Sequence, residues 1–229
     1  LNGDEVEHIL YKIDGDEGYV WFRSDSEEML NRARARVDNE LPGASQATKK
    51  AAMGEYISQD YAAQRFYKGK KSLEQLEAEG KLIRGHGNPN ANGVDFWIKD
   101  QDNVWHQFEV KTTFDSESSI GLGKMNKLES GDRQCSFTWS TDRLRRGHEQ
   151  GIMTDDQYFE ILDNMKKDGT FKVDVVSVKP PGGGSISKSC NTDIEIMYSK
   201  SIPKVDIDDG FKPAGVTTHV LNIENLESL

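Results

Sequence analysis

Two carboxylates and a lysine stand close together in the middle of the sequence, in a pattern that suits metal-assisted chemistry. Asp95 lies in the run 93–98 (Gly-Val-Asp-Phe-Trp-Ile), and Glu109 and Lys111 lie in the run 105–112 (Trp-His-Gln-Phe-Glu-Val-Lys-Thr). Clustered carboxylates repel one another unless a cation lies between them, and a hard divalent ion is the usual cation. Such an ion can activate water and stabilise the charge that develops on a phosphate. A neighbouring ammonium is suited to holding the attacking water or the phosphoryl oxygens.

Both runs have the apolar and aromatic content of half-buried β-strands, and the polar segment 100–103 between them indicates a turn. Residues two apart on a strand share a face, so Glu109 and Lys111 are predicted to point the same way. A five-residue loop, 100–104, would set Asp95 opposite Glu109 on that face. A four-residue loop would place them on opposite faces unless a bulge corrected the register.

The apolar residues of the two strands are expected to face the other layer of the protein. In the second strand these residues are Phe108 and Val110. In the first strand, alternation predicts one face made of Val94, Phe96 and Ile98.

The succession of Gly-Val-Asp, a hairpin and Glu-Val-Lys resembles the signature of the PD-(D/E)xK nuclease superfamily. In that family the aspartate and glutamate bind the metal and the lysine assists the nucleophile, and the resemblance implies these roles for Asp95, Glu109 and Lys111. The proline that begins the family signature is replaced here by Val94. An acid two residues before a lysine also occurs at Glu79, but no strand with an aspartate precedes it. The alternative is the charged, solvent-facing side of an edge hairpin.

The resemblance implies a fold, a metal and further site residues. The implied fold is α/β or α+β, a central mixed β-sheet flanked by helices with a restriction-endonuclease-like core. Asp95 and Glu109 would bind one or two divalent ions, with the Val110 carbonyl as a third ligand; Mg²⁺ is expected, with Mn²⁺ and Zn²⁺ as alternatives. In relatives a glutamate on the helix before the core strands often helps at the metal, a position held by Glu55; an exposed surface role suits it equally.

The region after Lys111 adds a looser likeness. A polar loop, a Gln-bearing turn and an amphipathic helix over 137–146 resemble polymorphic bacterial nuclease toxins, which are C-terminal domains used in contact-dependent inhibition or injected by secretion systems. The likeness covers residues 48–150. It implies that nucleic acid contacts Arg143, Arg145, Arg146 and His148, together with Gln134 and Lys124. For the basic residues of the helix, the alternative is a helix end that complements the macrodipole.

Together the resemblances imply a metal-dependent DNA endonuclease, with RNA a less favoured substrate. The implied setting is a bacterial toxin domain that is delivered from the producer into the target-cell cytoplasm and neutralised by a cognate immunity protein. The alternatives are a cytoplasmic restriction or repair endonuclease, and a non-catalytic nuclease-fold or acidic protein-binding module. The net charge of −10 counts against nucleic-acid binding unless basic residues gather locally, and it suits a basic protein partner.

Composition sets further bounds. The chain has 229 residues, 35% hydrophobic and 30% charged, which suits one domain with a sizeable core. No apolar run approaches the roughly 20 residues of a membrane span, so no membrane partner is expected. Cys135 and Cys190 are too few for a cysteine zinc site, and buried free thiols are favoured over a single disulfide. The first residue, Leu1, and the lack of a signal-peptide pattern suggest a piece of a longer polypeptide or a cloning artefact.

Periodicity and capping signals predict the other elements in three parts of the chain. Residues 1–46 form a leader layer or small subdomain, 47–179 the nuclease core, and 180–229 C-terminal strands that complete or extend the sheet. Strands are expected at 7–13, 18–23, 81–84, 171–178, 193–198 and 217–223, and helices at 26–37, 48–67, 73–80 and 155–168. His86 and His106 have no spaced partner, so structural roles are favoured for both. A solvated helix face is favoured for Arg32, Arg34 and Arg36 over a nucleic-acid patch.

Overall fold

The structure is a computed structural model, which describes most of the elements expected from the sequence. It describes the backbone of residues 7–13, 16–23, 26–85, 93–114, 137–167, 172–179 and 215–223, and the side chains of residues 29–85, 93–114, 138–167, 172–176 and 178. Several predictions fall outside these residues: the contacts of Lys124 and Gln134, the roles of His86, Cys135 and Cys190, and the strand at 193–198.

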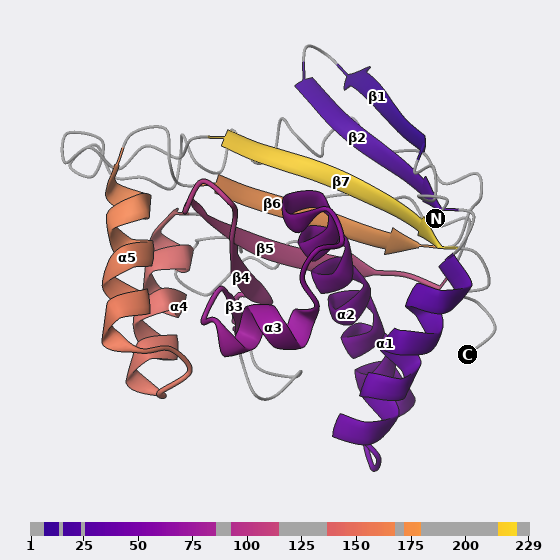
Figure 1. Ribbon diagram of the computed structural model, residues 1–229, viewed down its shortest axis with the longest axis horizontal. Coiled ribbons are helices and arrows are strands. Elements are labelled where there is room, and N and C mark those ends of the chain that lie inside the picture. The colour runs from indigo at the N-terminus through magenta and orange to yellow at the C-terminus, as the bar shows by residue number, and fades with distance from the viewer. Residues whose placement is uncertain are drawn as a thin grey trace.

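The fold is mixed α/β, with a mixed sheet flanked by helices, as expected (Figure 1). Its centre consists of β3 (Leu82–Arg84), β4 (Phe96–Lys99), β5 (Trp105–Thr112) and β6 (Lys172–Lys179). The first three of these strands are antiparallel neighbours, whereas β6 lies parallel to β5. The parallel pairing requires a crossover, which contains two helices.

The sheet continues beyond β6 into strands from both ends of the described chain. Strand β7 (Gly215–Ile223) is parallel to β6 and to β2 (Asp16–Arg23), and β1 (Glu7–Ile13) pairs antiparallel with β2 at the edge (Figure 1). The strands predicted at 7–13, 18–23 and 217–223 are therefore confirmed.

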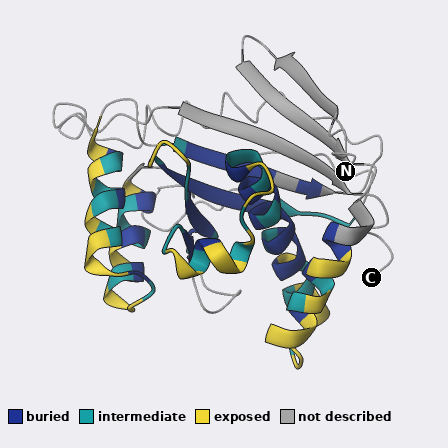
Figure 2. Cartoon of the chain, in the orientation of Figure 1, coloured by how far each residue is buried: buried dark blue, intermediate teal, exposed yellow. Residues whose placement is uncertain are grey.

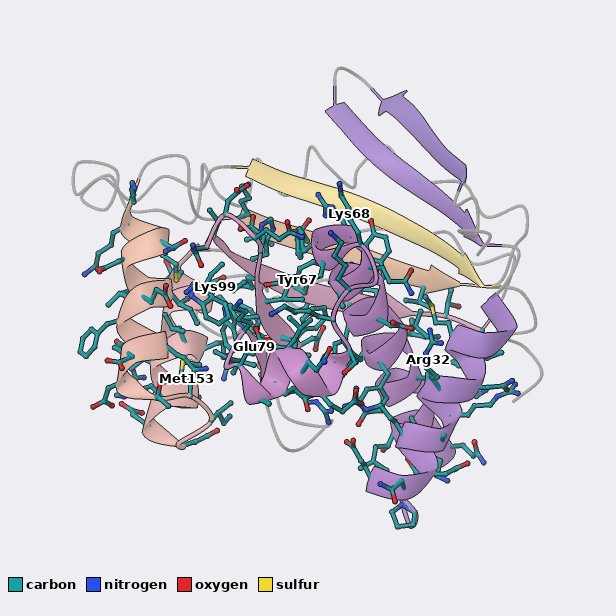
Figure 3. The ribbon with its side chains drawn as sticks, viewed as in Figure 1. Arg32, Tyr67, Lys68, Glu79, Lys99 and Met153 are labelled. Carbon is teal, nitrogen blue, oxygen red and sulfur yellow. The ribbon has the colours of Figure 1, made fainter. Side chains whose placement is uncertain are left out.

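Helices cover both faces of the sheet and define two apolar clusters (Figure 2). On one face, α1 (Ser26–Glu40), α2 (Gln46–Tyr67) and α3 (Leu73–Ala78) pack over Phe96, Ile98 and Phe108. On the other face, α4 (Phe137–Glu149) and α5 (Asp155–Lys166) pack over Trp97, Trp105 and Val175. At the sheet side of α2, the Tyr67 hydroxyl donates to the Lys99 carbonyl, and Figure 3 labels both residues.

Local signals explain where the helices begin and end. Ser45 caps α2 by accepting the Thr48 amide, and Ser72 and Thr154 form capping boxes at α3 and α5. After α3, Gly80 adopts a φ of 67°, which glycine tolerates best. No helix within the described ranges is both long and apolar enough to cross a membrane.

One expectation about the faces of the first core strand is wrong. Phe96 and Ile98 lie in the cluster beneath α2, as predicted, but Val94 lies in the other cluster with Trp97. The strand begins only at Phe96, and the chain bends at Asp95, so the alternation of the strand does not extend back to Val94.

Candidate active site

The register of β4 and β5 brings the two expected carboxylates together. Phe96 pairs with Phe108 and Trp97 with Gln107, and one further step along this antiparallel ladder sets Asp95 opposite Glu109. The connection is the five-residue loop Asp100 to Val104, so the sequence-based register is confirmed. Asp95 Oδ2 also accepts a hydrogen bond from the Val110 amide at 2.5 Å, which ties the bend to β5.

Glu109 and Lys111 form an ion pair on the same face of β5. Lys111 Nζ lies 2.7 Å from Glu109 Oε1. The Glu109 residue is only 2% exposed, and its second oxygen, Oε2, has no hydrogen-bond partner. Burial, followed by the charge of Asp95, raises the pKa of Glu109 to about 8, although Lys111 acts in the opposite direction. One lysine therefore does not neutralise this site.

Glu55 joins the group from α2. Burial, then the charge of Asp95, raises the pKa of Glu55 to about 9, while Arg84 acts to lower it. Glu55 also contributes to the raised pKa of Glu109. Glu55 is half-buried, and its charge acts on Glu109 while the charge of Asp95 acts on it, so its role at the metal stays a prediction. We call Glu55, Asp95, Glu109 and Lys111 the carboxylate site.

Two glycines permit the close approaches that assemble the carboxylate site. A Cβ on Gly54 would lie 1.7 Å from Thr112 Oγ1, so only glycine lets α2 lie this close to the end of β5. A Cβ on Gly85 would lie 1.5 Å from the Val94 carbonyl oxygen. The Gly85 amide donates to the Asp95 carbonyl at 2.9 Å, so this contact fixes the backbone that carries the aspartate.

Few groups of the carboxylate site are candidates to hold a metal ion. In the part of the chain that the structure describes, no three or more His, Cys, Asp or Glu side chains are grouped so that they could hold a metal ion. A place for Glu55 among the metal ligands stays a prediction. The remaining donors are Asp95, Glu109 and the Val110 carbonyl. The unpartnered, buried Glu109 Oε2 is the observation that fits a cation ligand at this position, because buried polar atoms are nearly always paired.

The predicted nucleic-acid contacts on α4 are engaged with neighbouring side chains. Arg145 pairs with Asp142 and Glu149, and Arg146 also pairs with Asp142. The Arg143 guanidinium lies 5.6 Å from the centre of the Trp139 ring. His148 bonds to Asp155 and stacks on Tyr158. Contact of these residues with nucleic acid stays a prediction.

The basic residues of α1 lie in ion pairs of the same kind. Arg32 pairs with Asp60, and Arg36 lies within salt-bridge distance of Glu40 and Glu77. The choice between a solvated helix face and a nucleic-acid patch for Arg32, Arg34 and Arg36 stays a prediction.

Two features of the site region lie beyond the sequence reasoning. A cavity of about 560 Å³ opens beside Glu55 and includes Gln59 and Arg84 among its lining residues. On the opposite face of β5, His106 binds two aspartates, although no spacing in the sequence indicates partners. The only sequence signal for Gln59 is its position one helical turn after Glu55.

Comparisons with protein families, with curated proteins and with solved structures found no match to this chain. The argument for function therefore depends on the geometry and chemistry of the carboxylate site.

Proposed function

We propose that this chain is a metal-dependent nuclease of the PD-(D/E)xK type that hydrolyses phosphodiester bonds, with DNA as the expected substrate. The observation that carries the proposal is the position of Asp95 opposite Glu109, with Lys111 Nζ 2.7 Å from the glutamate. The element order supports a restriction-endonuclease-like core: α2 precedes three antiparallel strands, and α4 and α5 lead to the parallel strand β6.

Each residue of the carboxylate site has a role in this proposal. Asp95, Glu109 and the Val110 carbonyl would hold the divalent ion. When bound, such an ion lowers the pKa of water and stabilises charge on the phosphate. Lys111 would orient the attacking water or hold a phosphate oxygen, because its ammonium group lies beside Glu109. Glu55, with a pKa of about 9, is protonated at neutral pH without a cation and can donate a hydrogen bond.

The biological setting is supported less directly. Delivery as a bacterial toxin and neutralisation by an immunity protein rest on the sequence resemblance, and both stay predictions. A restriction or repair endonuclease would carry the same carboxylate site. A non-catalytic binding module would contain the same side chains without turnover, so an activity assay separates it from both enzymes.

The direct test is cleavage of supercoiled plasmid with Mg²⁺, Mn²⁺ or Zn²⁺. We expect metal-dependent nicking by the unaltered chain and a loss of about 10²–10³-fold in Asp95→Asn and in Lys111→Met. Asp102→Asn and Lys70→Met are matched controls, since both residues are exposed and lie outside the site. Equal nicking by all five proteins would indicate a contaminating nuclease and would remove the support for the proposal.

A second readout does not depend on turnover. Adding Mg²⁺ or Mn²⁺ is expected to raise the melting temperature of the unaltered chain, because a ligand that binds only the folded state stabilises it. The increase should disappear in Asp95→Asn and remain in Asp102→Asn. A melting temperature that no divalent ion changes, together with no cleavage, would favour the binding module.

A further inference from the structure

The cavity beside Glu55 is formed by elements that are distant in the sequence. Its polar lining comes from the end of α1, from α2, α3 and β3, and from Gln157 of α5; among its residues are Glu40, Glu55, Gln59, Glu77 and Arg84. Its volume of about 560 Å³ lies in the range of small-molecule sites. Glu55 belongs to this cavity and to the carboxylate site, so a group bound in the cavity lies next to the proposed reaction centre. We call it the Gln59 cavity.

The amide of Gln59 is the feature of the cavity that indicates a ligand. Gln59 follows Glu55 by one helical turn, so the two side chains share a face of α2. The residue is 1% exposed, and its Oε1 has no hydrogen-bond partner. Buried polar atoms are nearly always paired, and a donor on a group bound in the cavity would pair this oxygen.

The charges of the lining restrict what that group can be. The described lining carries three carboxylates and one guanidinium, that of Arg84. Arg84 is engaged with Glu40 and with Glu77, at 2.7 Å in each case. Because its guanidinium is held by these two carboxylates, the described lining offers no free cation to a phosphate, and it favours an uncharged group that donates hydrogen bonds.

The apolar part of the lining restricts the ligand further. Leu82, Ile83 and Ile152 line the same cavity. A strongly hydrated ammonium group gains little from such a surface, whereas a flat ring is favoured by it. A planar, neutral ring with amino donors fits the apolar surface, a described lining without a free cation, and the unpaired Gln59 Oε1 together.

We propose that the Gln59 cavity receives one unpaired nucleobase of the substrate, a base that carries an exocyclic amino group, with Gln59 as the residue that recognises it. Glutamine and asparagine amides recognise adenine through this type of contact. A base enters such a cavity only after leaving its stack, so the substrate is single-stranded or carries an unpaired nucleotide beside the cleaved bond. The inference rests on the proposed nuclease function for the identity of the ligand.

The first test measures binding without turnover. The full chain, freed of metal with EDTA, is titrated with 2′-deoxyadenosine, 2′-deoxycytidine and thymidine in a calorimeter. We expect the two amino-bearing nucleosides to bind at least tenfold more tightly than thymidine. Gln59→Met, which keeps the shape of the side chain and removes the amide, should abolish the difference. Gln64→Met, on the same helix but outside the lining of the Gln59 cavity, should retain it.

The second test measures cleavage of single-stranded oligonucleotides that differ only in the base beside the cut. Gln59→Met should raise KM about tenfold for the amino-bearing bases, leave kcat unchanged and remove the preference over thymine. Asp95→Asn should instead lower kcat. Because Gln59→Met removes a buried oxygen that has no hydrogen-bond partner, its melting temperature should be close to that of the unaltered chain.

The outcomes separate the cavity from the nuclease function. Cleavage without nucleoside binding and without base preference would overturn the nucleobase proposal and leave the nuclease intact. Nucleoside binding without cleavage would support base binding in the Gln59 cavity and contradict the proposed nuclease function. Binding of arginine methyl ester, with no binding of any nucleoside, would assign the cavity to a cationic protein side chain and overturn the inference. The nucleoside panel on the unaltered chain decides the matter even if a variant fails to fold.

Discussion

Strand β5 carries two clusters of buried charge, one on each face, and only one of them is internally satisfied. The His106 network consists of Arg65, Asp100, His106 and Asp174. His106 Nδ1 lies 2.8 Å from Asp174 Oδ2, and its Nε2 lies 3.0 Å from Asp100 Oδ2. Arg65 donates to the other oxygen of Asp174 at 2.9 Å, and backbone amides donate to the other oxygen of Asp100.

In the carboxylate site, the charged groups are not all satisfied by partners within the cluster. Its Glu109 oxygen Oε2 is buried without a partner, and the pKa values of Glu109 and Glu55 rise to about 8 and about 9. In the His106 network, hydrogen bonds to His106 lower the pKa of Asp100 despite burial. Charges that satisfy one another stabilise a fold, whereas a cluster with excess negative charge is typical of a site that binds a cation.

The largest expected difference between the two clusters is in catalysis. Glu109→Gln should lower the rate of plasmid cleavage about 10²–10³-fold, because it removes an anionic metal donor. His106→Gln should change the rate less than about threefold at temperatures where both proteins are folded, because hydrogen bonds to both aspartates can persist. Single-turnover cleavage assays at saturating Mg²⁺ measure both. A loss of equal size in the two variants would contradict the division into a structural and a catalytic cluster.

The second expected difference is in the free energy of unfolding that is lost when a histidine is removed from its aspartate partners. His106→Ala should lower the free energy of unfolding by about 3 kcal/mol, because it leaves the buried Asp174 and the half-buried Asp100 without their shared partner. His148→Ala is the matched control, since its partner Asp155 has an 83% exposed side chain, and should cost less than about 1 kcal/mol. Urea unfolding measures both values. Equal costs would show that the buried network adds nothing to stability.

A smaller effect of opposite sign is expected in the carboxylate site. In EDTA at pH 7, Glu55→Gln should raise the free energy of unfolding by roughly 1–3 kcal/mol, because the folded state keeps this carboxyl protonated while the unfolded state ionises it. Glu149→Gln, at an exposed position paired with Arg145, should stay within about 0.5 kcal/mol. A destabilised Glu55→Gln variant would show that the ionised carboxylate is already compensated in the metal-free protein.

A last effect is on the pH dependence of stability, to which both clusters contribute in the same direction. Glu55 and Glu109 have raised pKa values, so stability falls as pH rises from about 4.5 towards 8–9 in EDTA. His106 also has a raised pKa: its contribution is complete below about 6.5 and is lost as pH rises through the folded-state value. Unfolding free energies at pH 5, 7 and 9 should therefore decline less steeply in Glu55→Gln between pH 5 and 7. Adding Mg²⁺ should reduce the decline only where the carboxylate site is intact.

The sequence by itself determined the local geometry of this protein. Side chains alternate along a strand with a period of two, so the sequence put Glu109 and Lys111 on one face and tied the place of Asp95 to the loop length; the five-residue loop of the structure then sets Asp95 opposite Glu109. Capping residues likewise indicate where a helix begins, because a cap and the backbone amide that it accepts lie within one helical turn. The same alternation failed for Val94, because the bend at Asp95 depends on the contact with Gly85, a residue outside the strand pair.

Only the tertiary structure decided which charges are buried and what surrounds them. The role of Glu55 depends on how closely Gly54 approaches Thr112, and the partners of His106 come from a nearby loop and from a strand far along the chain. The burial of Gln59 follows from the packing of α2 against the sheet. Desolvation and cross-chain contacts arise from the packing of elements distant in the chain, and no spacing between neighbouring residues encodes them.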